Sequence, residues 1–262
     1  RGFFNRQSAI AQAAKNGRRD TDHEFGTNPC SEIILRSRQF CNLSEVVIRA
    51  TDSIEDIIKK VVWAATIGTW QSTLTSFRYL SSKWQHNCEE ERLLGVSLTG
   101  IMDSPLTNGR GWENEDDFKK FLEMLKGIAV DTNARWAKKL GIPAATAITC
   151  VKPSGTVSQL VDSASGIHAR HAPHYIRTVR GDKLDPLTQM MMVAGFPYED
   201  DITKPDHAVV FSFPIKSPDD AVMRDDMSAV EQLHMWKIYQ DHWCEHKPSV
   251  TISVREDEWM DV

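Results

Sequence analysis

The pattern that most constrains the fold is an amphipathic stretch that runs unbroken from about Glu115 to Leu140. Its apolar residues recur at helical spacing and form one stripe, which consists of Phe118, Phe121, Leu122, Leu125, Ile128 and Trp136. Gly141 and Pro143 follow, as is typical just beyond the end of a helix. A strand-like run, ATAITCV at 145–151, comes next. A helix that leads into a strand favours an α/β fold with parallel strands.

The rest of the chain continues this alternation. Helices are expected over residues 5–17, from a cap at Asp52 onward, and over 228–246. Strands are expected over 208–213 and 249–254. The chain has 262 residues, of which 41% are hydrophobic, so it can bury a core as one large domain or two small ones. The predicted fold class is therefore α/β.

Composition excludes several kinds of partner. The formal net charge is −5 and no long basic stripe is present, so we expect no nucleic-acid partner. The sequence has no window of eighteen apolar residues and no signal peptide, so we expect no membrane partner. Five cysteines without a dense ladder fit a reducing compartment better than a disulfide scaffold. These features predict a cytoplasmic protein.

The segment NPCSEIILRSRQFCNLSE, residues 28–45, carries the most distinctive chemistry. Gly26 to Pro29 is expected to break regular structure, which puts Cys30 on a loop or at its tip. Asn28 and Glu32 bracket this thiol, and Cys41 follows eleven positions later. The glutamate could take a proton from a substrate hydroxyl that the asparagine holds. The cysteine would then act on a nearby carbon.

Three other interpretations of Cys30 remain open from the residues alone. The thiol could be buried and inert. It could be a zinc ligand with Cys41, His23 and Cys88, although the sequence contains no C-x-x-C pair. It could also be the nucleophile of a Cys–His hydrolase, because nine histidines are available as a base.

The segment VKPSGTVS suggests a phosphate-binding loop. A strand is expected to run into Ser154, Gly155, Thr156, Val157 and Ser158, and Gly155 would let the backbone turn tightly, at positive φ, and approach a ligand. Three hydroxyls and successive amides could bind an anion, and a following helix would add favourable partial charge. The alternative is an ordinary strand-to-helix turn, and the Gly-Lys-Ser/Thr ending of a Walker motif is absent.

Several blocks, in order along essentially the whole chain, resemble ribonucleotide reductases. They are NPCSEI with CNLSE, KPSGTVSQLVDSASGIH, CEEERLLGVSLTGIMD (88–103), HAPHYIRTVRGDKLDPL (171–187) and CEHKPSVTISV (244–254). The last three look most like the adenosylcobalamin-dependent, class II branch. The resemblance implies an oxidoreductase that converts ribonucleotides to 2′-deoxyribonucleotides, with adenosylcobalamin as cofactor.

The resemblance also implies residue roles. Cys30 matches the cysteine that becomes a thiyl radical and removes the 3′ hydrogen of the ribose. Glu32 matches the general base for the 3′ hydroxyl, and Asn28 matches the amide that binds the ribose hydroxyls. Cys41 matches one of two thiols that deliver reducing equivalents and end as a disulfide. Residues 154–158 match the substrate-phosphate loop.

The fold that the resemblance implies is the second half of a ten-stranded α/β barrel, with Cys30 on an inner finger loop. The partner thiol of Cys41 lies upstream in the family, and only 29 residues precede Cys30 here. The family's allosteric nucleotide region and C-terminal cysteine pair are also missing. We therefore expect residues 1–262 to be the C-terminal part of the catalytic barrel, inactive alone. The expected partners are a ribonucleotide, a thioredoxin-like or dithiol reductant, and an allosteric nucleotide on the missing part.

Two alternatives stay open beside the class II interpretation. A class I large subunit would take its radical from a di-iron partner, but its Tyr-Tyr pair is absent, since Tyr175, Tyr198 and Tyr239 stand alone. A non-catalytic nucleotide-binding remnant would have no reason to keep the loop residues. DTDHEFG nearly matches a cobalamin-ligating Asp-x-His pattern, but Thr21 replaces the aspartate, so His23 is expected to be a solvated loop residue. No metal ligand is predicted.

Overall fold

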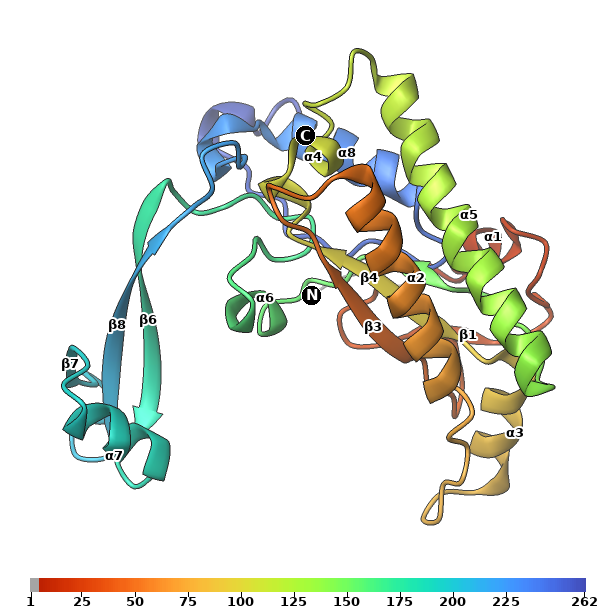
Figure 1. Ribbon diagram of the computed structural model, residues 1–262, viewed down its shortest axis with the longest axis horizontal. Coiled ribbons are helices and arrows are strands. Elements are labelled where there is room, and N and C mark those ends of the chain that lie inside the picture. The colour runs from red at the N-terminus through yellow and green to blue at the C-terminus, as the bar shows by residue number, and fades with distance from the viewer. Residues whose placement is uncertain (1–4) are drawn as a thin grey trace. The chain divides into compact units, whose positions relative to one another are not determined.

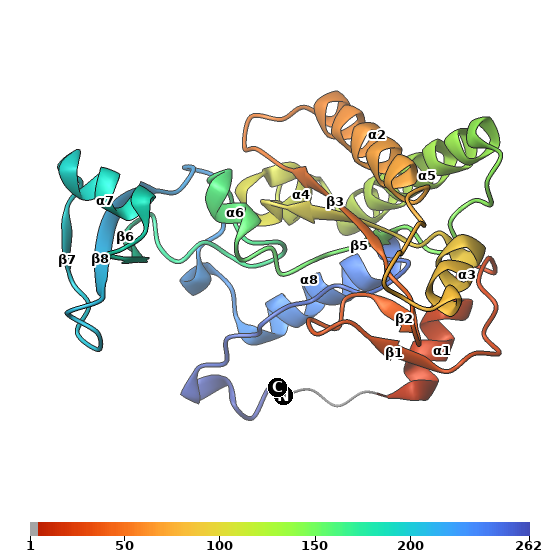
Figure 2. The same cartoon turned by 90° about the horizontal axis from the view of Figure 1, so that it is seen from below.

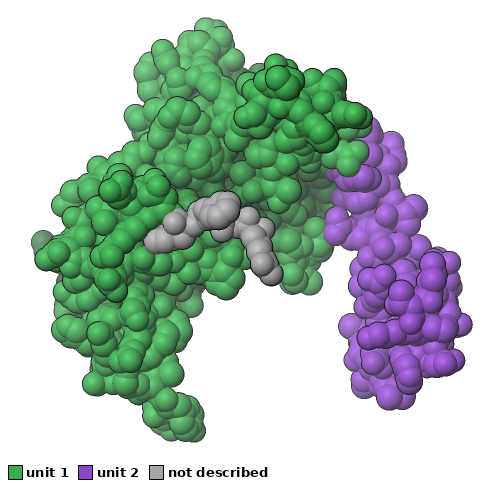
Figure 3. Space-filling model, turned by 180° about the vertical axis from the view of Figure 1, so that it is seen from behind, with its two compact units in different colours: residues 1–170, 220–262 green, residues 171–219 purple. Residues whose placement is uncertain are grey.

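The computed structural model describes residues 5–262 and shows a mixed α/β protein that divides into two compact units. Unit 1 comprises residues 1–170 and 220–262, and unit 2 comprises residues 171–219 (Figure 3). Each unit has its own sheet. The strands of unit 1 include the predicted parallel pairs, and those of unit 2 do not.

The main sheet of unit 1 has three parallel strands in the order β3 (Asn42–Val47), β4 (Leu94–Thr99) and β5 (Thr149–Cys150). Every residue of β4 is buried, as expected for the central strand of a parallel sheet. β3 pairs with β4 along its whole length and is an edge strand of this sheet. The prediction of parallel strands is therefore confirmed in unit 1.

Two long helices pack together over this sheet, and Figure 1 shows them side by side. α5 (Glu115–Leu140) has the predicted bounds, and Gly141 ends it in the left-handed conformation at φ 66°. α2 (Ile54–Gln71) begins one residue later than predicted. Its cap is Ser53 rather than Asp52, because the Ser53 side chain accepts the backbone N–H of Asp56, and the Asp56 carboxylate accepts the N–H of Ser53.

The buried core of unit 1 lies between these helices and the sheet. It also includes residues of α8 (Ala229–His242), which corresponds to the helix predicted over 228–246 and ends earlier. Figure 2 shows α8 on the other side of the strands from α2. The largest fully buried side chains include Trp243, Tyr239 and Phe118. The core therefore joins segments from both ends of the chain.

Two predicted strands are shorter or missing. Only Thr149–Cys150 of the run 145–151 is a strand, and residues 249–254 form none. Val151 makes an isolated parallel bridge to Pro248, in which the Val151 N–H donates to the Lys247 carbonyl. The Ser249 N–H completes this bridge by donating to the Val151 carbonyl at 2.8 Å. Residues 249–254 are exposed or half-buried, so a longer strand would gain little burial there.

A small antiparallel hairpin carries the predicted cysteine loop. Its strands are β1 (Phe25–Thr27) and β2 (Ile34–Arg36), and α1 (Arg6–Ala14) packs beside it (Figure 2). Gly26 and Thr27 belong to β1, so the predicted break in regular structure begins only at Asn28. Phe25 and Ile34 are buried and anchor the hairpin in a small apolar cluster with α1.

Unit 2 is an antiparallel sheet in the order β6 (His174–Asp182), β8 (Ala208–Lys216) and β7 (Tyr198–Asp200), with α7 (Pro186–Val193) between β6 and β7 in the chain. The strand predicted at 208–213 is present and extends to Lys216, but it pairs antiparallel. The chain passes through α7 and β7 and returns as β8 in the opposite direction beside β6. The connection is therefore not a parallel crossover.

The remaining elements are short and join these parts. They are α3 (Ser82–Glu91), α4 (Pro105–Asn108), α6 (Val157–Leu160) and 3-10 turns at Ile101–Asp103, Arg224–Asp226 and Glu256–Glu258. Among residues 5–262, no helix has the length and apolar character that crossing a membrane requires.

Candidate active site

The loop between β1 and β2 is fixed by its own hydrogen bonds. The Asn28 side-chain oxygen accepts the Ile33 N–H at 3.0 Å, and the Asn28 N–H donates to the Ile33 carbonyl at 3.3 Å. The Ser31 N–H donates to the Asn28 carbonyl at 2.9 Å, and Ser31 takes a left-handed φ of 64°. The loop therefore turns tightly and carries Cys30 exposed at its tip, where the sequence predicted a loop.

Glu32 lies two residues beyond Cys30 and is fully buried. Its Oε1 atom is 3.3 Å from the Lys152 ammonium nitrogen, and its backbone carbonyl accepts the Lys247 N–H at 2.9 Å. Its Oε2 atom has no hydrogen-bond partner within residues 5–262. A buried acceptor is costly to leave unpaired. The loop thus holds a buried carboxylate that pairs with Lys152 through one oxygen, while the other oxygen has no hydrogen-bond partner among residues 5–262.

Cys41 lies just before β3, next to the backbone of the central strand. A Cβ atom placed on Gly95 would lie 3.2 Å from the Cys41 sulfur, so glycine leaves room for this thiol. Burial raises the pKa of Cys41 above its ordinary value. The charges of Arg19 and Lys152 oppose this rise, and the charge of Glu32 adds to it. Cys41 is therefore a protonated thiol at neutral pH.

The other three cysteines are core residues. Cys88, Cys150 and Cys244 are all buried, and all five thiols of the chain are free. Burial raises the pKa of each of these three thiols. Within the part of the chain that the structure describes, no three metal-ligating side chains gather as a site, so the zinc interpretation of Cys30 has no support.

The loop after β5 lies near Glu32 through Lys152, and its residues differ in exposure. Ser154 and Ser158 are buried, whereas Gly155, Thr156 and Val157 are exposed. The Ser158 N–H donates to the Ser154 carbonyl at 3.0 Å, which starts the single turn of α6. The helix predicted after the loop is thus only four residues long.

The role predicted for Gly155 needs a correction. The left-handed residue of this loop is Ser154, at φ 51°, and Gly155 does not have a positive φ. A Cβ atom on Gly155 would meet nothing within 4 Å. The protein itself therefore does not require glycine at this position. Any requirement has to come from a ligand that approaches the open backbone.

Sequence reasoning missed Glu45, which ends the CNLSE motif on β3. The Ser154 hydroxyl donates to its carboxylate. Burial raises the pKa of Glu45, while hydrogen bonds from Ser154 and Ser97 and the charge of Lys152 oppose the rise. The sequence did contain a signal for Glu45: a charged residue inside a strand of a parallel sheet needs a polar partner.

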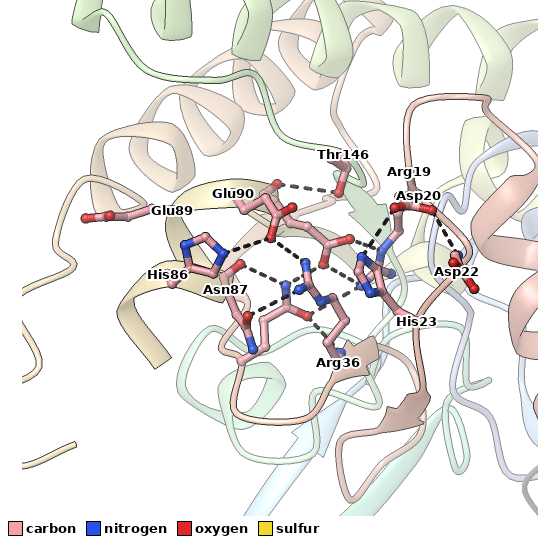
Figure 4. A network of polar contacts seen from close by, with 12 residues as sticks. Arg19, Asp20, Asp22, His23, Arg36, His86, Asn87, Glu89, Glu90 and Thr146 are labelled. Carbon is pink, nitrogen blue, oxygen red and sulfur yellow. Dashed lines mark hydrogen bonds and ion pairs between the residues drawn. The ribbon is translucent and has the colours of Figure 1, made fainter. Parts of the chain in front are cut away.

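A polar network anchors the hairpin at its base. The buried Arg19 guanidinium binds both carboxylate oxygens of Glu91, at 2.8 and 2.9 Å, and donates to the Ile34 carbonyl at 2.9 Å. Figure 4 shows the neighbouring part of this network, in which Arg36 and His86 both approach Glu90. These contacts connect β2 to α3 and fix the position of the loop.

Two histidines near the hairpin have different surroundings. His23 lies 3.6 Å from the Asp20 carboxylate, and its side chain is 25% exposed. His246 is fully buried, where its Nε2 atom is 3.0 Å from the Leu94 carbonyl and its Nδ1 atom accepts the Ile34 N–H at 3.4 Å. Burial, with the nearby Arg19 charge, lowers the pKa of His246 to about 3. His246 therefore joins β2 to β4 as a neutral ring.

Solved structures share this fold. A crystal structure of B12-dependent (class II) ribonucleotide reductase aligns with a TM-score of 0.74 at 24% identity, over 89% of this chain and 35% of that one. The Actinobacillus ureae class Id ribonucleotide reductase alpha subunit aligns with a TM-score of 0.57 at 13% identity, over 93% of this chain and 50% of that one. The fold is thus mixed α/β and similar to class II ribonucleotide reductase.

Curated relatives agree with this likeness. The chain is 28% identical over 257 residues to an adenosylcobalamin-dependent ribonucleoside-triphosphate reductase of Lactobacillus gasseri, a match that covers 89% of this chain and 34% of the relative. The Euglena gracilis enzyme of the same name is 28% identical over 257 residues and matches 96% of this chain. No protein-family model matches the chain.

These relatives confirm the resemblance on which the sequence analysis relied, and they favour class II over class I. The chain spans about a third of the length of the curated relatives it matches, since the matches cover 34% of them.

Proposed function

We propose that this chain is part of an oxidoreductase that reduces ribonucleotides to 2′-deoxyribonucleotides by a thiyl-radical mechanism. The observation that carries the proposal is the loop of residues 28–33. It combines an exposed thiol at Cys30 with a buried carboxylate at Glu32, one oxygen of which lacks a partner among the described residues. A thiol to take a hydrogen atom and a carboxylate to take a proton are the two groups that this reaction needs on one ribose.

In the proposed mechanism, a Cys30 thiyl radical takes the hydrogen atom from the ribose 3′ carbon. The Glu32 Oε2 atom accepts the proton of the 3′ hydroxyl, since Oε1 already faces Lys152. The Asn28 oxygen is bound to the Ile33 N–H, so its amide NH₂ is the group left to hold the ribose hydroxyls. The 2′ hydroxyl takes up a proton and leaves as water.

Two electrons and two protons for the reduction come from a pair of thiols. Cys41 is one of them, and its raised pKa keeps this half-buried thiol protonated until it reacts. The other belongs to a part of the full-length protein outside residues 1–262. The pair ends as a disulfide, the product gains hydrogen at the 2′ carbon, and Cys30 recovers the 3′ hydrogen as the radical returns to it. A thioredoxin-like protein or a small dithiol then reduces the disulfide.

The loop of residues 154–158 binds the substrate phosphates in this proposal. Gly155, Thr156 and Val157 are exposed, and a Cβ on Gly155 would meet nothing within 4 Å, which supports an approach of phosphate to this backbone. The loop is close to Glu32 in space because Lys152, which precedes it, contacts that carboxylate. One nucleotide could therefore reach both the loop and the carboxylate.

The exposed position of Cys30 fits a radical source outside this chain. The curated relatives are named as adenosylcobalamin-dependent, which supports adenosylcobalamin as the proposed source. When bound, this cofactor supplies the radical that removes the hydrogen atom from the Cys30 thiol. We assign no residue among 5–262 to hold it. Cys30 contributes the accessible thiol, and the hydrogen bonds of its loop hold that thiol in place.

The open edge of the sheet supports the proposal that residues 1–262 are the C-terminal half of a ten-stranded barrel. Among residues 5–262, β3 pairs with β4 alone, and its Leu43 is 38% exposed beside Trp63 and Ile67 of α2, which are 62% and 53% exposed. A free strand edge next to exposed apolar residues calls for a covering strand. In this proposal the upstream half-barrel supplies it, Cys30 occupies an inner finger loop, and the allosteric region and C-terminal cysteines lie elsewhere in the protein.

The test is to express the full-length gene and to assay ribonucleotide reduction with a dithiol reductant, with and without adenosylcobalamin. We expect deoxynucleotide only with the cofactor. Activity that needs a di-iron partner protein instead would support the class I alternative. Nucleotide binding without reduction under either condition would support a non-catalytic remnant and overturn the proposal.

A further inference from the structure

We infer that Lys152 is the positioning residue for Glu32: its ammonium pairs with one carboxylate oxygen and so leaves the other aimed at the substrate. This inference rests on the proposed function. It adds a role for the lysine of KPSGTVS, which the sequence analysis treated only as a lead-in to the phosphate loop.

The backbone brings the two side chains together through three neighbouring segments. The Lys247 N–H donates to the Glu32 carbonyl at 2.9 Å, and the Val151 N–H donates to the Lys247 carbonyl at 3.2 Å. The Lys152 N–H donates to the Ser97 hydroxyl of β4 at 2.9 Å. Both Glu32 and Lys152 are thus held by main-chain bonds before their side chains meet. The fold therefore sets the 3.3 Å contact between the Lys152 ammonium and the Glu32 carboxylate, unlike contacts between mobile surface side chains.

The charge balance requires a cation at this point. Glu32 is fully buried, and the Lys152 side chain is 23% exposed, so the pair lies at the edge of the interior. A buried carboxylate without a partner is strongly destabilising. Within residues 5–262, Lys152 makes the one ion pair recorded for Glu32. Cys41 and Cys150 interact electrostatically with both members of this pair, and Glu45 interacts with Lys152; none of these three groups brings a positive charge.

The pair also selects which oxygen reacts. Lys152 contacts Oε1, and Oε2 has no partner among the residues that the structure describes. If the ammonium were removed, the carboxylate would lose the contact that orients it, and either oxygen would be free to turn. The proton-transfer step, rather than the binding of phosphate, should therefore depend on Lys152. A phosphate ligand at the same position would instead affect the Michaelis constant.

The activity test uses the full-length enzyme with three substitutions. Lys152→Met should lower kcat by about a hundredfold while KM changes by less than about threefold. Lys152→Arg, which keeps the charge, should recover most of kcat. Lys237→Met is the matched control, because it removes an exposed lysine that pairs with Asp241 on the surface of α8. It should leave both constants unchanged.

A double-mutant cycle separates positioning from other roles. Gln at position 32 carries no charge to balance, so Lys152→Met should lower kcat little further in the Glu32→Gln background. The same variants should be compared by their thermal unfolding midpoints. Lys152→Met alone should lower the midpoint, and the double variant with Glu32→Gln should recover part of that loss. The unfolding cycle needs no activity, so it tests the Lys152–Glu32 pair even if the proposed function fails.

Two results would overturn the inference. One is a large rise in KM with unchanged kcat in Lys152→Met, which would make Lys152 a phosphate ligand. The other is additive effects of the two substitutions on kcat and on unfolding, which would mean that the side chains act independently.

Discussion

Two loops meet near Lys152, and they differ in how they present their functional groups. The loop of residues 28–33 is closed by hydrogen bonds of Asn28 to Ile33 and Ser31, and its Glu32 side chain is buried against Lys152. The loop of residues 154–158 leaves Gly155 to Val157 exposed, with open space at the glycine. The difference matches the two proposed tasks. Transfer of a hydrogen atom and a proton needs fixed side chains, and binding of phosphate needs reachable main-chain amides.

The largest effect should come from the fixed loop, at Cys30. Cys30→Ser in the full-length enzyme should abolish reduction, because a serine O–H bond is too strong for the radical to be generated at oxygen in its place. The measurement is deoxynucleotide formation under saturating substrate and cofactor. Appreciable product from this variant would break the comparison, since the fixed loop would then not hold the reactive group.

Cys41→Ser should stop the reaction later. Formation of the Cys30 radical does not need Cys41, but the reduction step does. The variant should form the initial radical, which electron paramagnetic resonance would detect. It should then stall and release decomposed substrate. Cys88→Ser is a control for loss of a buried thiol that has no proposed redox role. Normal multiple turnover by Cys41→Ser with a dithiol reductant would remove Cys41 from the redox pair.

A smaller effect is expected at the open loop. Gly155→Val should raise KM roughly tenfold to about 150-fold, because the added side chain would displace a charge-assisted hydrogen bond of about 1.5–3 kcal/mol. The protein has room for this side chain, so folding should be unaffected. Gly127→Val on α5 is the matched control, because a Cβ there also meets nothing within 4 Å. Equal KM values for both variants would show that no phosphate approaches Gly155.

The smallest effect concerns the support of the fixed loop by His246. Its pKa is about 3 in the fold, against 6.5 as the ordinary value. Below pH 6.5 the unfolded chain binds a proton that the folded chain refuses, so His246 should reduce the free energy of unfolding as pH falls from about 6.5 toward 3. The slope is about 1.4 kcal/mol per pH unit at most.

The measurement for His246 is denaturant unfolding of the full-length protein and of His246→Asn, at pH 7 and pH 5. The loss of stability between these two pH values should be smaller in the variant, because asparagine binds no proton in this range. An identical loss in both proteins would show that His246 titrates normally and does not support the loop as a neutral ring.

Sequence alone predicted those parts of the structure that local pattern controls. The helix from Glu115 to Leu140 has its predicted bounds because periodicity and the Gly141 stop agree there. The loop position of Cys30 followed from Asn28 and Pro29. The missing strand at 249–254 could not be foreseen, since its apolar residues match a strand, whereas in the described part of the chain the pairing with β5 stops at the Val151–Pro248 bridge.

The candidate site was predictable only in part for the same reason. Asn28, Cys30 and Glu32 are near one another in sequence, and the structure gathers them on one hairpin. The contacts of Glu32 with Lys152, and of Ser154 with Glu45, join residues over a hundred positions apart. Their pairing depends on strand order and on burial, which no local pattern specifies. The positive φ at Ser154 rather than Gly155 was equally hidden, because serine adopts it only under tertiary constraint.

The central claim is that thiols of this protein reduce a ribose under radical control, and one measurement tests it most directly. Thiol hydrogens exchange with solvent, and the ribose carbon-bound hydrogens do not. The full-length enzyme should be incubated with a ribonucleotide, a dithiol and adenosylcobalamin in D₂O, and the product examined by mass spectrometry and NMR. The account predicts a deoxynucleotide with one deuterium at the 2′ carbon. A deoxynucleotide without deuterium at that carbon would contradict it, because the hydrogen would not have come from a thiol.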